Sequence, residues 1–197
     1  MDTISYTFDG NLYLNITNRC MMSCPYCIKH KASNTFAGND LKLKKEPSTQ
    51  EVIKDMKDKN FKKYTNVTFC GYGDSLIRLD EVKEISNFLK ENKMAVRINT
   101  AGLANRYYGR NILPDLENFI DIISISLNGT NPKEHNELNH PMYKEEAFDE
   151  IIQFAKTAKN YIPQVVITAV ENLGFDVLKV EQIANQAGVT FRLRAFL

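Results

Sequence analysis

Three of the four cysteines lie within eight residues, at Cys20, Cys24 and Cys27, while Cys70 stands alone. In a reducing cytoplasm this spacing indicates a metal site rather than a disulfide framework. Three thiolates would leave a four-iron cluster with one iron open to a substrate or cofactor. His30 as a fourth ligand would instead complete a structural zinc site. The spacing alone leaves both alternatives open.

The elements that must position this loop alternate between strands and helices along the chain. Alternating or β-rich runs predict strands at 12–17, 67–70, 95–99, 121–128, 165–170 and 189–196. Helices are predicted after Ser48, Asp80 and Asp176, and around Ile151. Such alternation demands parallel pairing and right-handed crossovers, so the class is α/β with a parallel sheet. The chain is shorter than the about 250 residues of a full eight-unit barrel, which leaves an incomplete barrel or a doubly wound open sheet.

Polar side chains recur at every second position of several predicted strands. Residues two apart share a face of a strand, so one face of the sheet is expected to be polar and to line a ligand cavity. The alternative is that Ser and Asn are satisfied inside the core and that the C-terminal arginines protect an edge strand. The polar positions are Asn15, Thr17, Arg97, Asn99, Ser124, Ser126, Asn128, Arg192 and Arg194.

The overall composition is that of an average globular protein. Of the residues, 43% are hydrophobic and 25% charged, and 25 Lys+Arg balance 24 Asp+Glu, so no whole-molecule field favours nucleic acid or a membrane. No run approaches the roughly 18 apolar residues of a membrane span, and the first residues lack a signal-peptide pattern. We therefore expect one cytoplasmic domain over residues 1–197 without a membrane partner.

The stretch from Lys29 to Lys63 has an excess of positive charge, since it contains 10 Lys and 5 Asp+Glu. We interpret this stretch as a solvated helix face and a loop. The alternative is a docking surface for an acidic partner, such as nucleic acid or an electron-donating flavodoxin. The connection from His30 to Pro47 is long, which predicts a lid or a disordered segment. His135 and His140 follow the fourth predicted strand in a polar segment and are expected to be solvated.

The cysteine pattern resembles that of the radical S-adenosylmethionine (SAM) superfamily. Cys-x3-Cys-x2-Cys, with an aromatic residue before the last cysteine, follows the strand-like run Leu12-Tyr13-Leu14-Asn15-Ile16-Thr17. Phe69-Cys70-Gly71-Tyr72-Gly73-Asp74-Ser75-Leu76 stands where that family has a glycine-rich segment ending in Glu-Pro. The similarity continues through 97–103 and 124–128. Among subgroups, the chain is most similar to the small radical SAM proteins associated with TatD-type nucleases.

The resemblance implies a partial (β/α)6 TIM-type barrel, a [4Fe–4S] cluster and SAM as cofactors. It implies that Cys20, Cys24 and Cys27 ligate the cluster, and that reductive cleavage of SAM gives a 5′-deoxyadenosyl radical that abstracts hydrogen from an unknown substrate, small or macromolecular. Arg97, Arg192 and Arg194 are weaker candidates for gripping that substrate. The residues implied in SAM binding are Tyr26, Gly71, Tyr72, Gly73, Asp74, Asn99, Ser126 and Asn128.

Asp74-Ser75 departs from the family's Glu-Pro. Asp is shorter by one methylene, and Ser frees the backbone that Pro would fix, so a looser contact with the SAM amino group is expected.

The resemblance as a whole predicts that the chain is an oxidoreductase-type radical SAM enzyme. The alternative is a non-catalytic zinc-binding interaction module that uses Cys20, Cys24, Cys27 and His30.

Overall fold

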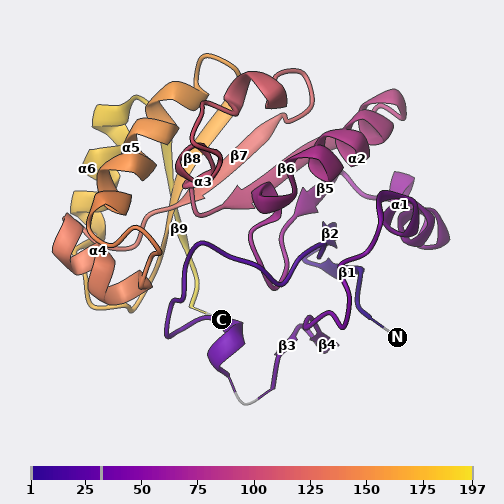
Figure 1. Ribbon diagram of the computed structural model, residues 1–197, viewed down its shortest axis with the longest axis horizontal. Coiled ribbons are helices and arrows are strands. Elements are labelled where there is room, and N and C mark those ends of the chain that lie inside the picture. Colours follow the sequence, from indigo (N-terminus) through magenta and orange to yellow (C-terminus); the bar gives the residue numbers. More distant parts are fainter. Residues whose placement is uncertain (1, 32, 197) are drawn as a thin grey trace. The chain divides into compact units, whose positions relative to one another are not determined.

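The computed structural model describes residues 2–31 and 33–196 (Figure 1). The chain forms two compact units. The first unit runs up to Cys20 and includes Tyr26–Asn99 and Asn118–Asp121. The second includes Met21–Pro25, Thr100–Glu117 and the chain from Ile122 onward. Because these segments interleave, no single cut in the sequence separates the units. The assignment of residues 1–197 to one domain stays a prediction.

Over its described residues the first unit combines strands with two helices and three short 3-10 turns. Its hydrogen-bonded strand order is β1-β2-β5-β6, in which β1 is antiparallel to β2 while β2, β5 and β6 run parallel. A separate hairpin pairs β3 with β4. The elements are β1 (Ser5–Phe8), β2 (Asn11–Leu14), η1 (Ile28–His30), β3 (Thr35–Phe36), β4 (Asn39–Asp40), α1 (Thr49–Asp58), η2 (Phe61–Lys63), β5 (Asn66–Phe69), η3 (Ser75–Arg78), α2 (Leu79–Glu91) and β6 (Ala95–Thr100).

The second unit has the parallel strand order β7-β8-β9. Helices α5 and α6 pack against β8 and against each other, and α4 packs on α5 (Figure 1). The elements are α3 (Ala104–Tyr108), η4 (Leu113–Leu116), β7 (Ile122–Ser126), α4 (Pro132–Asn139), α5 (Glu146–Ala158), β8 (Gln164–Val170), α6 (Val177–Ala187) and β9 (Thr190–Arg194). The predicted α/β class with mostly parallel strands is confirmed in both units.

Local sequence signals set several helix ends as expected. Ser48, after which a helix was predicted, forms a capping box with Glu51 at the start of α1. Asp176 accepts the Leu178 N–H at 3.0 Å to begin α6, which ends at Gly188. Helix α2 is different, because it begins at Leu79 directly after the η3 turn and places Asp80 in its first turn rather than at its cap.

The long connection after His30 was predicted to be a lid or a disordered segment; residues 41–43 are packed and hydrogen-bonded within the first unit, and the lid stays a prediction. Leu41 and Leu43 are buried. The Asn18 side chain donates to the Leu43 carbonyl at 2.7 Å and accepts the Leu43 N–H at 3.0 Å. Apolar burial and paired backbone groups therefore fix this segment against the chain that precedes the cysteines. Ala32 lies outside the described residues.

The predicted polar face is only partly exposed. Four of its residues are buried, as in the alternative that places these polar side chains inside the core: Asn15, Thr17, Ser124 and Asn128. Arg97 and Asn99 are half-buried. On β9 the apolar side chain of Leu193 is 45% exposed. Across 2–31 and 33–196, no helix is both long and apolar enough to cross a membrane.

His135 is fully buried, which corrects the expectation that it is solvated. Among the described residues neither ring nitrogen has a hydrogen-bond partner, and the ring packs edge-on to Phe148 with centroids 5.9 Å apart. Burial lowers the pKa of His135 to about 4. The folded protein therefore holds His135 neutral across most of the range in which an unfolded histidine becomes protonated.

We expect His135→Phe to remove part of the acid sensitivity of folding. Between a pKa near 6.5 unfolded and about 4 folded, the unfolded chain binds the extra proton, so stability falls as pH falls through this window. From about pH 7.5 to about pH 5 the wild type should lose about 2 kcal/mol more than the variant. Urea unfolding at both pH values measures this, with His30→Phe, at an exposed histidine, as the control. Equal losses in wild type and His135→Phe would contradict the assignment.

Candidate functional site

The chain that enters the cysteine loop is held by the buried side chain of Asn15. Its Nδ2 donates to the Thr3 carbonyl at 2.9 Å and the Leu41 carbonyl at 2.8 Å, and its Oδ1 accepts the Tyr72 N–H at 2.9 Å. One amide thus joins three segments of the first unit. The end of β2 and the glycine-rich segment after β5 are thereby fixed to each other.

Gly71 and Gly73 allow a very close approach between backbone segments. A Cβ on Gly73 would come 2.2 Å from the Arg19 carbonyl oxygen, and one on Gly71 would come 2.2 Å from Asn15 Oδ1. The Asp74 N–H donates to the same Arg19 carbonyl at 2.9 Å. In this structure the two glycines therefore let residues 71–74 pack on the chain just before Cys20. Their contact with SAM stays a prediction.

Asp74 is buried and begins the η3 turn, where its Oδ1 accepts the Leu76 N–H at 3.0 Å. A residue with an acceptor side chain at this position stabilises the start of a helical turn. The shorter side chain that replaces the family's Glu thus has a structural task here. The looser SAM contact expected from Asp74-Ser75 stays a prediction.

A buried arginine that the sequence analysis missed binds the same segment from the other side. Arg78 Nη1 donates to the carbonyls of Ile16 at 2.8 Å and Pro47 at 2.7 Å, and Nη2 pairs with Glu81 at 2.7 Å. The Arg78 side chain is only 9% exposed. The guanidinium fork therefore ties the residues before the cysteine loop to the start of α1.

Glu46 connects this arginine with the loop entrance. It accepts from Thr17 and from Arg19 Nε at 2.8 Å, and lies 3.8 Å from Arg78 Nε. Partial burial alone would raise the pKa of Glu46, but the hydrogen bonds from Arg19 and Thr17 and the charges of Arg19 and Arg78 outweigh it, so the pKa is lowered. The carboxylate thus stabilises the fold above its ordinary pKa of 4.5, and this contribution is lost as pH falls below it.

All four cysteines are free thiols and partly exposed. Cys20 and Cys27 belong to the first unit and Cys24 to the second. Cys27 precedes the η1 turn, where Lys29 Nζ donates to the Asn18 carbonyl at 2.6 Å and lies 5.2 Å from the centre of the Tyr72 ring. Burial, with smaller electrostatic contributions from the neighbouring Cys27 and Asp40, raises the pKa of Tyr72. The glycine-rich segment and Cys27 are therefore neighbours.

The middle of the cysteine loop is bound to the turn after α4. The Ser23 N–H donates to the carbonyls of Asn139 and His140, both at 3.2 Å. Met22 forms an antiparallel bridge with Pro141, and the Met142 N–H donates to the Met21 carbonyl at 3.0 Å. Backbone pairing on both sides of Met22 gives the stretch that carries Cys24 a defined direction.

The remaining predicted site residues lie on both units. Arg97 Nε donates to Asn99 Oδ1 at 3.2 Å within β6. Asn128 is buried, with its Oδ1 accepting the Val170 N–H at 2.8 Å. Tyr26, Ser126 and Arg194 are half-buried, and Arg192 is exposed. Contacts of these residues with SAM or substrate stay predictions.

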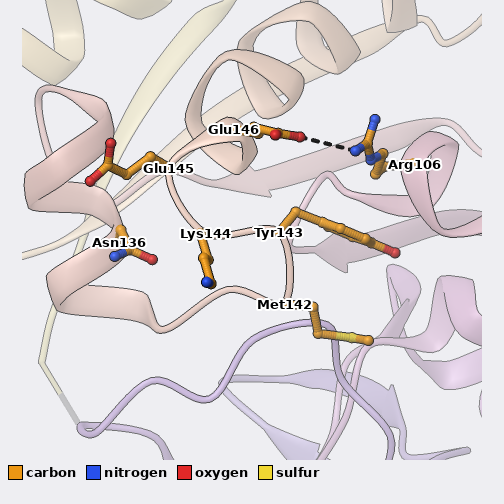
Figure 2. Close-up of a pocket in the computed structure, with 7 residues that line it drawn as sticks. All are labelled: Arg106, Asn136, Met142, Tyr143, Lys144, Glu145 and Glu146. Atoms are coloured by element: carbon orange, nitrogen blue, oxygen red, sulfur yellow. Dashed lines mark hydrogen bonds and ion pairs between the residues drawn. The ribbon is translucent and has the colours of Figure 1, made fainter.

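A recess of about 460 Å³ that the sequence did not indicate opens between α3, α4 and the α4–α5 connection (Figure 2). Arg106 on its rim pairs with Glu146 at 2.9 Å and Glu150 at 3.6 Å, and its guanidinium lies 5.5 Å from the centre of the Tyr143 ring. Met142, at the end of the turn that binds the cysteine loop, also lines the recess. The arginine is thus neutralised by carboxylates and adds no free positive charge.

Within the described ranges, no three His, Cys, Asp or Glu side chains are grouped so as to hold a metal ion. The assignment of Cys20, Cys24 and Cys27 as ligands stays a prediction. Its chemistry is consistent, because the three cysteines form no disulfide, are partly exposed and lie within a stretch of eight residues. Thiolates are the ordinary protein ligands of iron–sulfur clusters, so these residues fit such a group.

The Radical SAM superfamily matches residues 14–186, which is most of the chain. A comparison with curated proteins found no match. The chain belongs to the Radical SAM superfamily. It is therefore an enzyme of unknown substrate, from a superfamily whose members typically use SAM and a [4Fe–4S] cluster.

Proposed function

We propose that Cys20, Cys24 and Cys27 hold one [4Fe–4S] cluster and leave its fourth iron for SAM. The observation that carries this proposal is the packing of Gly71–Asp74 on the chain before Cys20, in a member of this superfamily. When bound and reduced, the cluster would supply the one electron that breaks the sulfonium S–C5′ bond of SAM, giving methionine and a 5′-deoxyadenosyl radical that takes a hydrogen atom from the substrate. The chain's own residues bind and orient SAM and exclude water.

The SAM amino group is proposed to bind backbone carbonyls of residues 71–74, because an ammonium needs acceptors and this segment packs on the chain just before Cys20. Tyr26 is proposed to pack near the cluster or the adenine. Ser126 and Asn128, at and just beyond the carboxyl end of β7, are proposed to face the ribose or carboxylate, and Asn99, near that end of β6, is proposed to bind SAM. Chemistry at this end of parallel strands is the general pattern in α/β folds.

We further propose that the parallel strands form a partial (β/α)6 barrel whose lumen encloses the radical chemistry. A carbon radical in open solution would be quenched, so the site requires exclusion of water. Arg97, Arg192 and Arg194 are proposed to grip an anionic group of the substrate. Assignment to the TatD-associated subgroup rests on the sequence pattern alone.

The proposed partner is an acidic electron donor such as a flavodoxin. Lys42, Lys44 and Lys45 are exposed on the segment whose backbone is bonded to Asn15 and Asn18, next to the chain that enters the cysteine loop. Clustered lysines attract an acidic protein at a rate that falls with salt. The free cysteines are consistent with a reducing cytoplasm, which we propose as the location.

The test is anaerobic reconstitution of the full chain with iron and sulfide. We expect about four iron per chain, as a [4Fe–4S] cluster requires, a brown colour, and 5′-deoxyadenosine after addition of dithionite and SAM. A colourless protein that retains zinc but no iron would overturn the proposal and favour the zinc-binding alternative. Iron uptake without formation of 5′-deoxyadenosine would overturn the proposed cleavage of SAM and leave the proposed cluster intact.

A further inference from the structure

The side-chain amide of Asn139 has a single orientation imposed by its neighbours. Its Nδ2 donates to two backbone carbonyls, those of Asn128 at 2.7 Å and His135 at 2.8 Å. Carbonyls only accept hydrogen bonds, so the amide nitrogen must face them and the amide oxygen must face away. Asn139 is 2% exposed, which leaves no room for the amide to turn toward water.

The neighbouring amide of Asn128 enforces the same orientation. Asn128 Oδ1 accepts the Val170 N–H at 2.8 Å, so its Nδ2 points the other way and donates to Asn139 Oδ1 at 3.4 Å. Flipping either amide would bring donor against donor or acceptor against acceptor. The direction of the Asn139 oxygen is thus set by backbone groups at both ends of the chain of amides.

That oxygen is directed at Cys24. Cys24 Sγ lies 3.8 Å from Asn139 Oδ1 and donates to it as a thiol. A cysteine that ligates metal is a thiolate and has no proton to donate. Because the amide cannot turn, an acceptor oxygen then faces a negatively charged sulfur.

We propose that Asn139 is a positioning residue that lowers the reduction potential of the iron–sulfur cluster through Cys24. This inference rests on the proposed function, since it requires Cys24 to be a cluster ligand. Hydrogen bonds and charges near the sulfurs set the potential of such clusters. The negative end of the amide dipole beside Cys24 Sγ opposes added electron density, whereas an N–H donor there would favour it. The reduced cluster is thereby a stronger reductant toward SAM.

The experiment is a redox titration of the reconstituted holoenzyme, followed by electron paramagnetic resonance. Asn139→Ala removes the oxygen, and Asn139→Ser replaces it with a hydroxyl that can donate to sulfur. Both should favour the reduced cluster about tenfold, a shift of about 59 mV to more positive potential for one electron. The control is Asn136→Ala, the same substitution one turn earlier on α4, which should leave the potential unchanged.

Each outcome decides the inference. An unchanged potential in both Asn139 variants, with iron content equal to wild type, overturns it and leaves the proposed function intact. Folded Asn139 variants that no longer take up iron also overturn it, because Asn139 would then be needed to build the site rather than to tune it. A wild-type protein that takes up no iron overturns the proposed function itself. If Asn139→Ala fails to fold, the potential of Asn139→Ser decides.

Discussion

Replacing Cys24 with alanine is expected to reduce 5′-deoxyadenosine formation by at least about a hundredfold, beyond the roughly 10–100-fold typical of residues outside the ligand set. With two thiolates left, the chain lacks the donors for a stable four-iron cluster. Cys20→Ala and Cys27→Ala should behave in the same way. Product yield by chromatography after dithionite reduction, together with iron per chain, measures the effect.

The chain offers a matched control in its fourth cysteine. Cys70 follows β5 and is bonded through its backbone, with its N–H donating to the Leu14 carbonyl at 3.0 Å and its own carbonyl accepting from Tyr6 at 3.2 Å. Cys70→Ala keeps these bonds and should take up as much iron as the wild type. Full iron content in Cys24→Ala, or loss of iron in His30→Ala equal to that in Cys24→Ala, would contradict the three-cysteine ligand set.

The sequence predicted those parts of the fold that arise from interactions between residues close together in the chain. The capping box at Ser48 and Glu51 joins residues three apart, and the Asp176 cap joins residues two apart. Signals of this kind need no tertiary structure and can be read directly. The strand alternation in β6 likewise predicted which side chains are buried, because a strand alternates its faces residue by residue.

Helix α4 was missed because its buried face is polar. Asn131 caps it and Pro132 occupies its first turn, but the buried residues in its last two turns are His135 and Asn139. Hydrophobic periodicity searches for apolar residues at such positions and finds none. The tertiary contacts of this face identify it as buried: His135 packs on Phe148, and Asn139 accepts a hydrogen bond from Asn128. The second unit's support for Cys24 was therefore invisible in the sequence.

The network around Arg78 was missed for a different reason. Arg78 bonds the carbonyl of Ile16, 62 residues earlier, and that of Pro47, 31 residues earlier. No local pattern joins positions so far apart, and an arginine within an apolar run is ordinarily interpreted as a surface residue. The glycine-rich segment was found, but its close packing on Thr17 and Arg19 depends on tertiary structure in the same way.

Arg78→Met is expected to lower the free energy of unfolding by about 3 kcal/mol, because it leaves the buried carbonyls of Ile16 and Pro47 without donors. Methionine fills similar volume, so the loss reports hydrogen bonding rather than a cavity. Urea unfolding monitored by circular dichroism measures it. Arg106→Met is the control, since Arg106 is 45% exposed and its pairs with Glu146 and Glu150 should contribute less than about 1 kcal/mol.

Variants of Arg78 also separate its effect on stability from its effect on iron uptake. Arg78→Lys keeps a positive charge beside Glu46 and Glu81, but an ammonium lacks the planar fork that reaches both carbonyls, so it should recover only part of the lost stability. Equal stability of Arg78→Met and wild type would mean that residues 16–19 are held without this arginine. If Arg78→Met is destabilised as expected, its iron uptake at low temperature should also fall, because the chain that leads to Cys20 then loses its bond from Arg78 at the Ile16 carbonyl.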